Sequence, residues 1–265
     1  IRRYTALAAE REDCIALTIG EPDLPTPAPI CEAAVRALAG GSTHYTANQG
    51  SASLRAKLAA YEAKTRQLDY GPDEILVTAG ATEAIYCALT GVLDPGDEVV
   101  IPTPAFGLYE TVTRLAGAVP VYLDTARTGF QLTYEALCAA ITPRTKALVL
   151  NNPSNPTGMV YTKAELEAIA EVCCRHNIYV IADEIYCNLV YDNNEFVSFA
   201  SLGEDVKERT ILVNGVSKSY AMTGWRIGYS ASNPQLAKVM ANYLSHSTSA
   251  PSTISQQAAI TALTG

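Results

Sequence analysis

Positive charge is scarce in this sequence. Its 265 residues include 19 Lys and Arg against 27 Asp and Glu, which gives a formal net charge of -8 at pH 7 and a pI near 4.9. A chain of this sign repels polyanions, so the composition argues against nucleic acids and anionic membrane surfaces as partners. An anionic ligand would need a local pocket of positive charge.

Signals for export, membrane insertion and disulfide bonding are also lacking. The given residues show no signal-peptide pattern and no apolar run of about 18 residues, so nothing in them indicates export or a membrane span. The seven cysteines are odd in number and no pair has C-x-x-C spacing, which argues against a disulfide framework or a metal site. We expect buried, reduced thiols and a cytoplasmic protein. Because the chain opens on Ile1 without a methionine and stops at Gly265, we expect part of a longer protein or a sequence with missing segments.

A further absence narrows the class of fold. No G-x-G-x-x-G follows the first predicted strand, which argues against a nicotinamide-binding doubly wound fold. The sequence also has no internal repeat, linker or low-complexity tract. What is present is a globular composition with 48% hydrophobic and 17% charged residues, in a chain long enough for one large domain or two small ones.

Short apolar runs alternate with helix-like stretches along most of the chain. Several runs are rich in Val, Ile and Leu without polar alternation, as expected for strands covered on both faces. The predicted strands cover residues 75–78, 98–102, 119–123, 147–151, 179–183, 210–214 and 226–230. This alternation predicts an α/β domain with a mostly parallel sheet. Ligands bind such sheets beyond the carboxyl ends of the strands.

The helix predictions rest on amphipathic spacing and on end signals. The predicted helices cover residues 31–39, 53–66, 82–93, 162–176 and 255–263. Thr162 and Glu165 have the spacing of a capping box, in which each side chain accepts from the other residue's backbone N–H. Residues 19–29 are rich in Pro and predict an extended arm with turns.

Polar residues gather where the predicted strands end. Asp183 closes one apolar run, and a carboxylate there is costly unless a cation pairs with it. Residues 151–158 hold two Asn-Pro turns in one short loop, which fixes the backbone and presents amide side chains. Residues 78–82 form a small-residue turn into a helix, where free N–H groups can bind an anion. Lys218 follows another strand.

Three motifs carry a resemblance to a known family. They are S-K-x5-G-x-R-x-G at residues 217–228, N-P-x-N-P-T-G at residues 152–158 and D-E-x-Y at residues 183–186. Residues 94–99 also look like the family's turn into its second strand. In this order and at these separations, the sequence resembles the class I/II aminotransferases, the fold type I enzymes that use pyridoxal phosphate. The resemblance runs from Gly20 to the last predicted helix.

The resemblance implies an architecture. It is a three-layer αβα large domain with a mostly parallel seven-stranded sheet, and the C-terminal small domain of the family is absent from this chain. Residues 1–40 correspond to the N-terminal arm and first helix on the small-domain side, and residues 41–265 to the domain that binds pyridoxal phosphate. The family's arginine for the substrate α-carboxylate lies in that small domain, so no residue here is assigned to it.

The resemblance also implies roles around the cofactor ring. Lys218 is expected to bind the cofactor as an internal aldimine and later to move the substrate α-proton, which needs a pKa lowered by burial and nearby cations. Asp183 is expected to keep the ring nitrogen protonated, so that the ring acts as an electron sink. Asn155 and Tyr186 are expected to hydrogen-bond the phenolic oxygen, and Phe106 to stack on the ring. Lys218, Asp183 and Tyr186 form the predicted catalytic set.

The cofactor phosphate has its own predicted set. It comprises the N–H groups of Ala81 and Thr82, the hydroxyls of Thr82 and Ser217, and the guanidinium of Arg226, whose planar fork suits phosphate oxygens. Ala81 stands where the family often has glycine, which leaves the N–H in place. Tyr45 resembles the tyrosine that reaches the phosphate of the neighbouring subunit, which implies a homodimer.

Substrate contacts are predicted at Gly20, whose backbone is expected to meet the substrate, and at Asn155; no metal is expected. The favoured reaction is amino-group transfer between an amino acid and a 2-oxo acid through the pyridoxamine form of the cofactor. A carbon–sulfur β-lyase on the same fold is an alternative, and the residues Asp183 to Tyr186 favour the transaminase. A second alternative is the cofactor-binding sensor domain of a transcription regulator, although no basic helix-turn-helix segment is present. The amino donor stays open.

Overall fold

A seven-stranded sheet forms the middle layer of the computed structural model, which describes residues 2–264. The strands, in chain order, are β1 (Ile75–Thr78), β2 (Glu98–Thr103), β3 (Val119–Asp124), β4 (Thr145–Asn151), β5 (Tyr179–Asp183), β6 (Thr210–Gly215) and β7 (Gly228–Ala231). Across the sheet the order is β1-β7-β6-β5-β4-β2-β3, and β7 runs antiparallel to both of its neighbours while all other pairs are parallel. The predicted fold class, a mostly parallel αβα domain, is confirmed.

The described residues contain ten α-helices. They are α1 (Arg2–Ala9), α2 (Ala28–Ala39), α3 (Ala52–Arg66), α4 (Ala81–Val92), α5 (Leu108–Leu115), α6 (Tyr134–Ala140), α7 (Lys163–Arg175), α8 (Glu204–Arg209), α9 (Pro234–Ser245) and α10 (Thr253–Ala262). None of the helices in residues 2–264 has the length and apolar character needed to cross a membrane.

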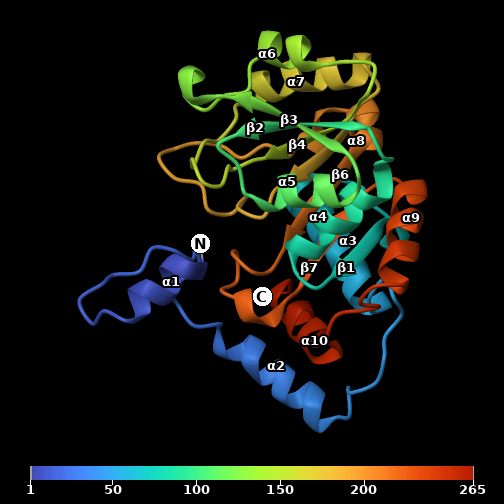
Figure 1. The fold of residues 1–265 in the computed structure, drawn as a ribbon. Helices are drawn as coiled ribbons and strands as arrows, with labels where there is room; N and C mark the ends of the chain where they lie inside the picture. Colours follow the sequence, from blue (N-terminus) through green and yellow to red (C-terminus); the bar gives the residue numbers. More distant parts are fainter. Residues whose placement is uncertain (1, 265) are drawn as a thin grey trace.

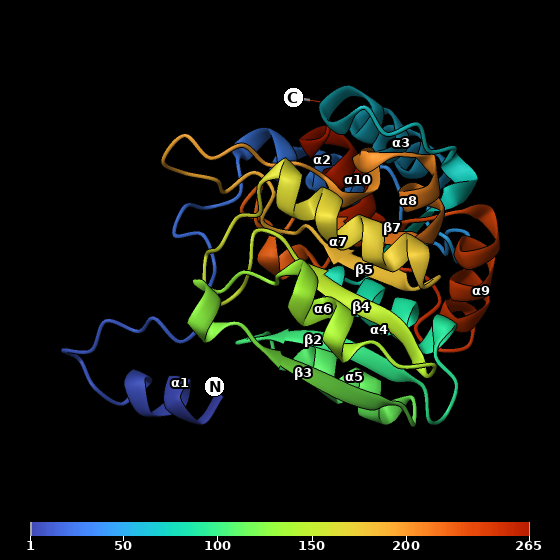
Figure 2. The ribbon, with the colours of Figure 1, turned by 90° about the horizontal axis from the view of Figure 1, so that it is seen from above.

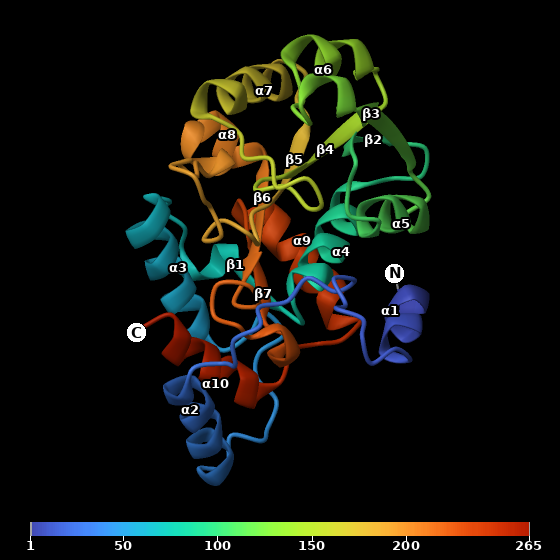
Figure 3. The same cartoon turned by 90° about the vertical axis from the view of Figure 1, so that its left-hand side faces the viewer.

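The two faces of the sheet bury separate cores. Ile181 and Ile211 lie side by side in β5 and β6 and pack with α4, α5 and α9, whereas their successors Ala182 and Leu212 face the opposite side. On that opposite side, α3 and α10 lie over β1 and β7, and α6 and α7 lie over β2, β4 and β5. Figure 3 shows these two helix layers with the strands between them. Burial on both faces explains why the central strands are apolar throughout.

The predicted strands agree with the structure to within two residues at each end. Thr162 and Glu165 form the expected reciprocal capping box at the start of α7. The last strand was predicted to begin at Arg226 but begins at Gly228. Arg226 instead has a left-handed backbone with φ 54°, because it ends the short 3-10 helix η4 (Thr223–Trp225) and turns its guanidinium back toward the start of α4.

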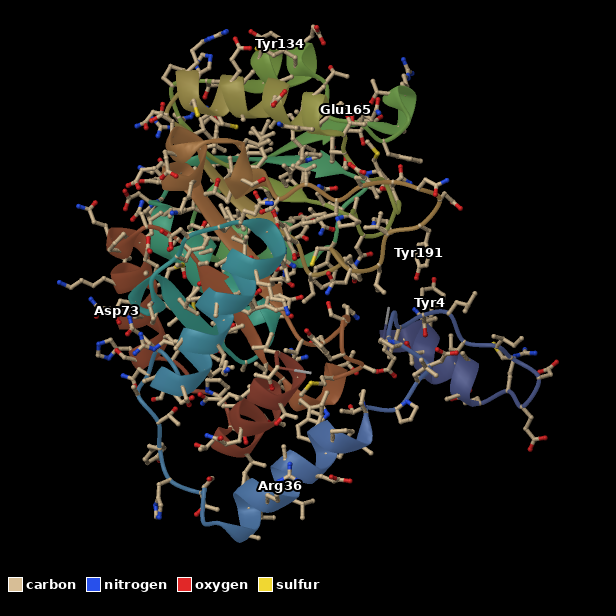
Figure 4. All side chains as sticks on the ribbon, turned by 180° about the vertical axis from the view of Figure 1, so that it is seen from behind. Tyr4, Arg36, Asp73, Tyr134, Glu165 and Tyr191 are labelled. Atoms are coloured by element: carbon tan, nitrogen blue, oxygen red, sulfur yellow. The ribbon has the colours of Figure 1, made fainter. Side chains whose placement is uncertain are left out.

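The N-terminal region lies outside the three layers. In Figures 1 and 2, α1 stands apart from the sheet, and the extended arm of residues 10–27 leads from it to α2. The helix α2 packs along α10, where Ile30 and Ala34 meet Ala258 and Ala259. Figure 4 shows Tyr4 on α1 and Arg36 on α2, both exposed. The arm is therefore fixed to the body through α2 and through contacts near the site.

Candidate active site

One cleft of about 730 Å³ lies at the carboxyl ends of the parallel strands, between their loops and the arm. Figure 1 shows these loops on the side of the sheet where α1 also lies. Ten of the eleven predicted site residues line the cleft: Gly20, Ala81, Thr82, Phe106, Asn155, Asp183, Tyr186, Ser217, Lys218 and Arg226. They come from the arm, from the last residue of β5 and from segments after β1, β2, β4, β5 and β6, which are far apart in the sequence.

Asp183 is a buried acid at the end of β5. Its Oδ2 accepts from the hydroxyl of Tyr109 at 2.7 Å, and its Oδ1 accepts from the N–H of Ile185 at 3.3 Å. Burial raises the pKa of this carboxyl to about 6, although both hydrogen bonds act to lower it. Among residues 2–264, no cationic side chain forms an ion pair with it. The carboxylate is thus poised for a positive partner that the protein does not supply.

Lys218 places an amine in the same cleft. It follows β6, and its Nζ donates to the backbone carbonyl of Gly20 in the arm. The amine also lies 5.7 Å from the ring centroid of Tyr186, within cation–π range. Burial lowers the pKa of Lys218, and the charge of Arg226 lowers it further, against an opposing effect of Glu21. The amine is therefore easier to deprotonate than an ordinary lysine.

Asn155 and Tyr186 add a pair of hydrogen-bonding groups to this cleft. The amide Nδ2 of Asn155 lies 3.3 Å from the phenol oxygen of Tyr186 and donates to it. The loop that carries Asn155 is held to β5, because Asn151 accepts from the N–H of Asn155 at 2.6 Å and donates to the carbonyl of Asp183 at 2.8 Å. Burial raises the pKa of Tyr186, so the phenol keeps its proton and can donate it in a hydrogen bond.

The start of α4 forms an anion cradle. In the described residues, the N–H groups of Ala81 and Thr82 have no protein acceptor, as the first turn of a helix leaves them. Arg226 lies against this turn, with Nη2 donating to the carbonyl of Ala79 at 3.3 Å. A side chain at Gly80 would collide with the guanidinium, since its Cβ would lie 2.4 Å from Nη2. Ser217 adds a buried hydroxyl to the same cleft.

Among the predicted aromatic site residues, Phe106 lines the cleft and Tyr45 does not. Phe106 forms part of the cleft wall and meets Tyr109 edge to face, with ring centroids 5.8 Å apart. Tyr45 is 99% exposed and does not line the cleft of its own chain. Its expected role in a neighbouring subunit stays a prediction.

Comparison with known proteins decides the family. The family described as "Aminotransferase class I and II" matches residues 12–265. The chain belongs to the class I and II aminotransferases. It is 46% identical over 260 residues to the aspartate aminotransferase of Geobacillus stearothermophilus, covering 98% of this chain and 66% of that relative. It is 45% identical over 253 residues to the aspartate/prephenate aminotransferase of Thermus thermophilus, covering 95% of this chain and 65% of that relative.

Solved structures of class I and II aminotransferases agree with the fold. The structure of the aspartate aminotransferase from Rhizobium meliloti matches with a TM-score of 0.95 at 43% identity, covering 100% of this chain and 66% of that chain. A Thermus thermophilus aspartate aminotransferase with maleate matches with a TM-score of 0.94 at 43% identity, covering 99% and 68%. The chain spans just under two thirds of the length of the curated relatives named above.

Class I and II aminotransferases use pyridoxal phosphate, and the cleft has groups that suit each part of that molecule. The anion cradle suits the phosphate, and the unpaired buried carboxylate of Asp183 suits a protonated ring nitrogen. The hydrogen-bond donors of Asn155 and Tyr186 suit a phenolic oxygen, and the amine of Lys218 suits the aldehyde. The residues present fit the cofactor.

Tyr109 and Thr223 also belong to the site, although neither was predicted from the sequence. Tyr109 donates to Asp183 from α5, and Thr223 accepts from Nη1 of Arg226 through its carbonyl at 3.0 Å. The spacing of Phe106 and Tyr109, three residues apart around the start of α5, was a usable signal because i and i+3 side chains share a helix face. Thr223 offered no such signal, since only its backbone contacts the arginine.

Proposed function

We propose that this protein transfers an amino group between an amino acid and a 2-oxo acid, with pyridoxal phosphate as cofactor. The observation that carries the proposal is one cleft that holds a lysine of lowered pKa, a buried unpaired acid and an anion cradle. Each of these groups has an ordinary structural explanation alone. Their convergence from separate segments favours a cofactor site.

The bound cofactor would supply an aldehyde that condenses with amines and a ring that takes up the electrons released at the substrate α-carbon. Lys218 would hold the cofactor and, once displaced by substrate, carry the α-proton on Nζ. The lowered pKa of this amine makes its neutral, proton-accepting form easier to reach than in an ordinary lysine. Asp183 would hold the proton on the ring nitrogen, since its charge is buried and stabilised only by hydrogen bonds.

The remaining residues would orient the cofactor and set its electronics. Asn155 and Tyr186 would donate to the phenolic oxygen, and Phe106 would cover one face of the ring. The N–H groups of Ala81 and Thr82 with the Arg226 guanidinium would bind the phosphate. Gly20 would meet the substrate through its backbone, in place of its present contact with Lys218.

The relatives' names favour transamination over the alternatives. Those named above are called aspartate aminotransferase or aspartate/prephenate aminotransferase. We therefore propose aspartate and 2-oxoglutarate as the first substrate pair to test, with prephenate as a second acceptor. A β-lyase would use the same lysine and acid, and a sensor domain would bind the cofactor without turnover.

The cofactor assignment is tested by absorption spectroscopy. Purified protein with pyridoxal phosphate should show the visible band of a lysine-bound cofactor, reducible by borohydride. Lys218→Ala should lose this band while far-UV circular dichroism stays unchanged. Lys238→Ala, an exposed lysine on α9, is the matched control and should keep the band. A borohydride-reducible adduct that survives in Lys218→Ala would refute the assignment of this residue.

The reaction is tested with alternative substrates. The protein loaded with cofactor should convert aspartate and 2-oxoglutarate to oxaloacetate and glutamate. When the oxo acid is omitted, each site should react only once. Cystathionine tests the β-lyase. Release of pyruvate and ammonia from it, without any turnover that depends on an oxo acid, would overturn the transaminase proposal. Cofactor binding without either reaction would favour the sensor.

Three further features are proposed from the same data. We propose a homodimer in which Tyr45 reaches the phosphate of the neighbouring site. We propose a cytoplasmic location, supported by seven cysteines that are all free thiols. We also propose the division at residue 40 between the N-terminal arm with its helix and the cofactor-binding domain.

A further inference from the structure

The segment between Lys218 and Arg226 has a strained backbone. Ala221 has φ 51° and Arg226 has φ 54°, and both are non-glycine residues in the left-handed region. The left-handed backbone is unfavourable for a residue that carries a Cβ. Strain of this kind persists only where surrounding contacts hold it. The segment therefore needs external support to keep the guanidinium on the anion cradle.

Thr26 supplies that support from the arm. Its hydroxyl donates to the carbonyl of Ala221 at 2.6 Å and accepts from the indole Nε1 of Trp225 at 3.0 Å. Thr26 precedes Ala221 by 195 residues, so the contacts join the arm directly to a distant part of the chain. One hydroxyl therefore holds both ends of the strained segment. It contacts Ala221 at one end and Trp225, which precedes Arg226, at the other.

A second contact links the same two segments to the cradle. The hydroxyl of Thr223 donates to Oε2 of Glu21 at 2.9 Å, and the carbonyl of Thr223 accepts from Nη1 of Arg226 at 3.0 Å. The arm, the 221–226 segment and the guanidinium therefore form one continuous hydrogen-bonded unit.

We propose that Thr26 is a positioning residue for the anion-binding guanidinium of Arg226, so that docking of the arm and binding of a phosphate group are coupled. The proposal rests on the proposed function, in which Arg226 binds phosphate. Coupling of this kind is reciprocal: loss of the Thr26 contacts weakens phosphate binding, and phosphate binding stabilises the docked arm. Typical coupling changes affinity by about 5-fold or more.

The test uses purified protein without cofactor and inorganic phosphate as the probe. Thr26→Val keeps the shape of the side chain and removes both hydrogen bonds, whereas Thr26→Ser keeps the hydroxyl. The matched control is Thr65→Val on α3, whose hydroxyl bonds only within its own helix region. Phosphate affinity is measured by calorimetry. Thr26→Val should raise the Kd for phosphate by about 5-fold or more, and Thr26→Ser and Thr65→Val should bind like wild type.

The single tryptophan provides an independent readout. Trp225 is the only tryptophan in the sequence, and its indole donates to Thr26. Its emission should shift to longer wavelength in Thr26→Val and become more accessible to acrylamide, with recovery in Thr26→Ser. A role in folding alone would change the unfolding midpoint without this local signature.

The possible outcomes separate the coupling from the proposed function. If wild type binds phosphate and Thr26→Val binds it with the same Kd, the inference is wrong. If Thr26→Val does not fold, Thr26→Ala removes the same two hydrogen bonds without adding a methyl group, and an unchanged phosphate Kd in that variant overturns the inference. If wild type binds neither phosphate nor pyridoxal phosphate, the proposed function fails instead.

Discussion

Asp183 is the residue at which burial and chemistry conflict most clearly. It ends an almost entirely buried strand, and its charge meets two hydrogen-bond donors but no cation among the described residues. Its pKa of about 6 shows that desolvation outweighs both donors. In the proposed function, a bound cationic ring nitrogen would reverse this balance and so account for an acid in such a position.

This conflict predicts a pH dependence of the cofactor-free protein. The folded pKa of Asp183, about 6, lies above its usual value of 3.8, so the native state binds more protons than the unfolded state between these pH values. Stability should therefore be fully present below pH 4 and fall as pH rises through 6, by about 3 kcal/mol. Asp183→Asn should remove this fall.

Guanidinium unfolding of both proteins at intervals from pH 4 to 7 checks the prediction. Glu184 also has a raised pKa, about 8, and contributes a loss of stability over a wider range in both proteins. The difference between the two curves isolates Asp183. Parallel curves across this range would show that the acid is not desolvated as proposed.

At this scale the sequence predicted the acid and the amine but not all their partners. Asp183 and Lys218 were indicated because polar residues directly after apolar strands lie at the ligand-binding edge of an α/β sheet. Tyr109 was missed because a tyrosine inside an amphipathic helix also suits the core, and its hydroxyl partner is 74 residues away. Partnership across such a distance depends on the tertiary fold.

The turn into α4 needs glycine at residue 80 for two reasons, its backbone conformation and the space beside it. Gly80 has φ 85°, a backbone conformation that side chains rarely adopt, and its missing Cβ leaves room for the Arg226 guanidinium. Gly96 has a similar φ of 91°, but no atom lies within 4 Å of the place that a Cβ would occupy there. A side chain at either glycine would strain the backbone, but only a side chain at Gly80 would also collide with Arg226.

Gly80→Ala and Gly96→Ala are therefore a matched pair. Both should lose about 1 to 3 kcal/mol of stability, because both place a side chain at positive φ. Only Gly80→Ala should also displace the guanidinium and weaken phosphate binding, by roughly 10-fold, the loss expected when a charged hydrogen bond is removed. Thermal unfolding and phosphate calorimetry measure the two effects. Equal phosphate affinity in both variants would show that the Arg226 guanidinium does not bind the phosphate.

Element boundaries were predictable where local physics sets them. The strands followed from apolar runs and the start of α7 from its capping box. The last strand was predicted two residues early because Arg226 and Ile227 adjoin it in sequence, whereas the left-handed turn at Arg226 is fixed by contacts with Ala79 and Thr223. The helices α6 and α8 span only 7 and 6 residues and depend on packing against the sheet, whereas the amphipathic pattern of α5 was a usable signal in the sequence.

For the whole molecule, Tyr45 is the feature that the single chain leaves unexplained. Its side chain is 99% exposed, yet the loop that carries it is held firmly. Thr253 donates to the carbonyl of His44, and Gln256 donates to the hydroxyl of Thr46 at 3.1 Å. A phenol presented on a fixed loop suits contact with a second copy of the chain, which supports the homodimer proposal. The strand order could not be derived from sequence patterns, since no local signal specifies it.

Mixing of variant subunits tests whether Tyr45 acts across the dimer. Tyr45→Phe should weaken binding of pyridoxal phosphate, whereas Tyr4→Phe on α1, also an exposed tyrosine, should not. Lys218→Ala should form no lysine-bound cofactor. In a mixed dimer of Tyr45→Phe with Lys218→Ala, one of the two sites would combine an intact lysine with an intact tyrosine from the neighbouring chain.

After equal amounts of the two variants exchange subunits, about a quarter of all sites should bind the cofactor with wild-type affinity, since half of the dimers are mixed and each has one intact site. The visible band is titrated at a cofactor concentration too low to load Tyr45→Phe alone. If Tyr45 served its own chain, every site in the mixture would still carry one defect. No high-affinity sites would then appear, and the exposed tyrosine would need a different explanation.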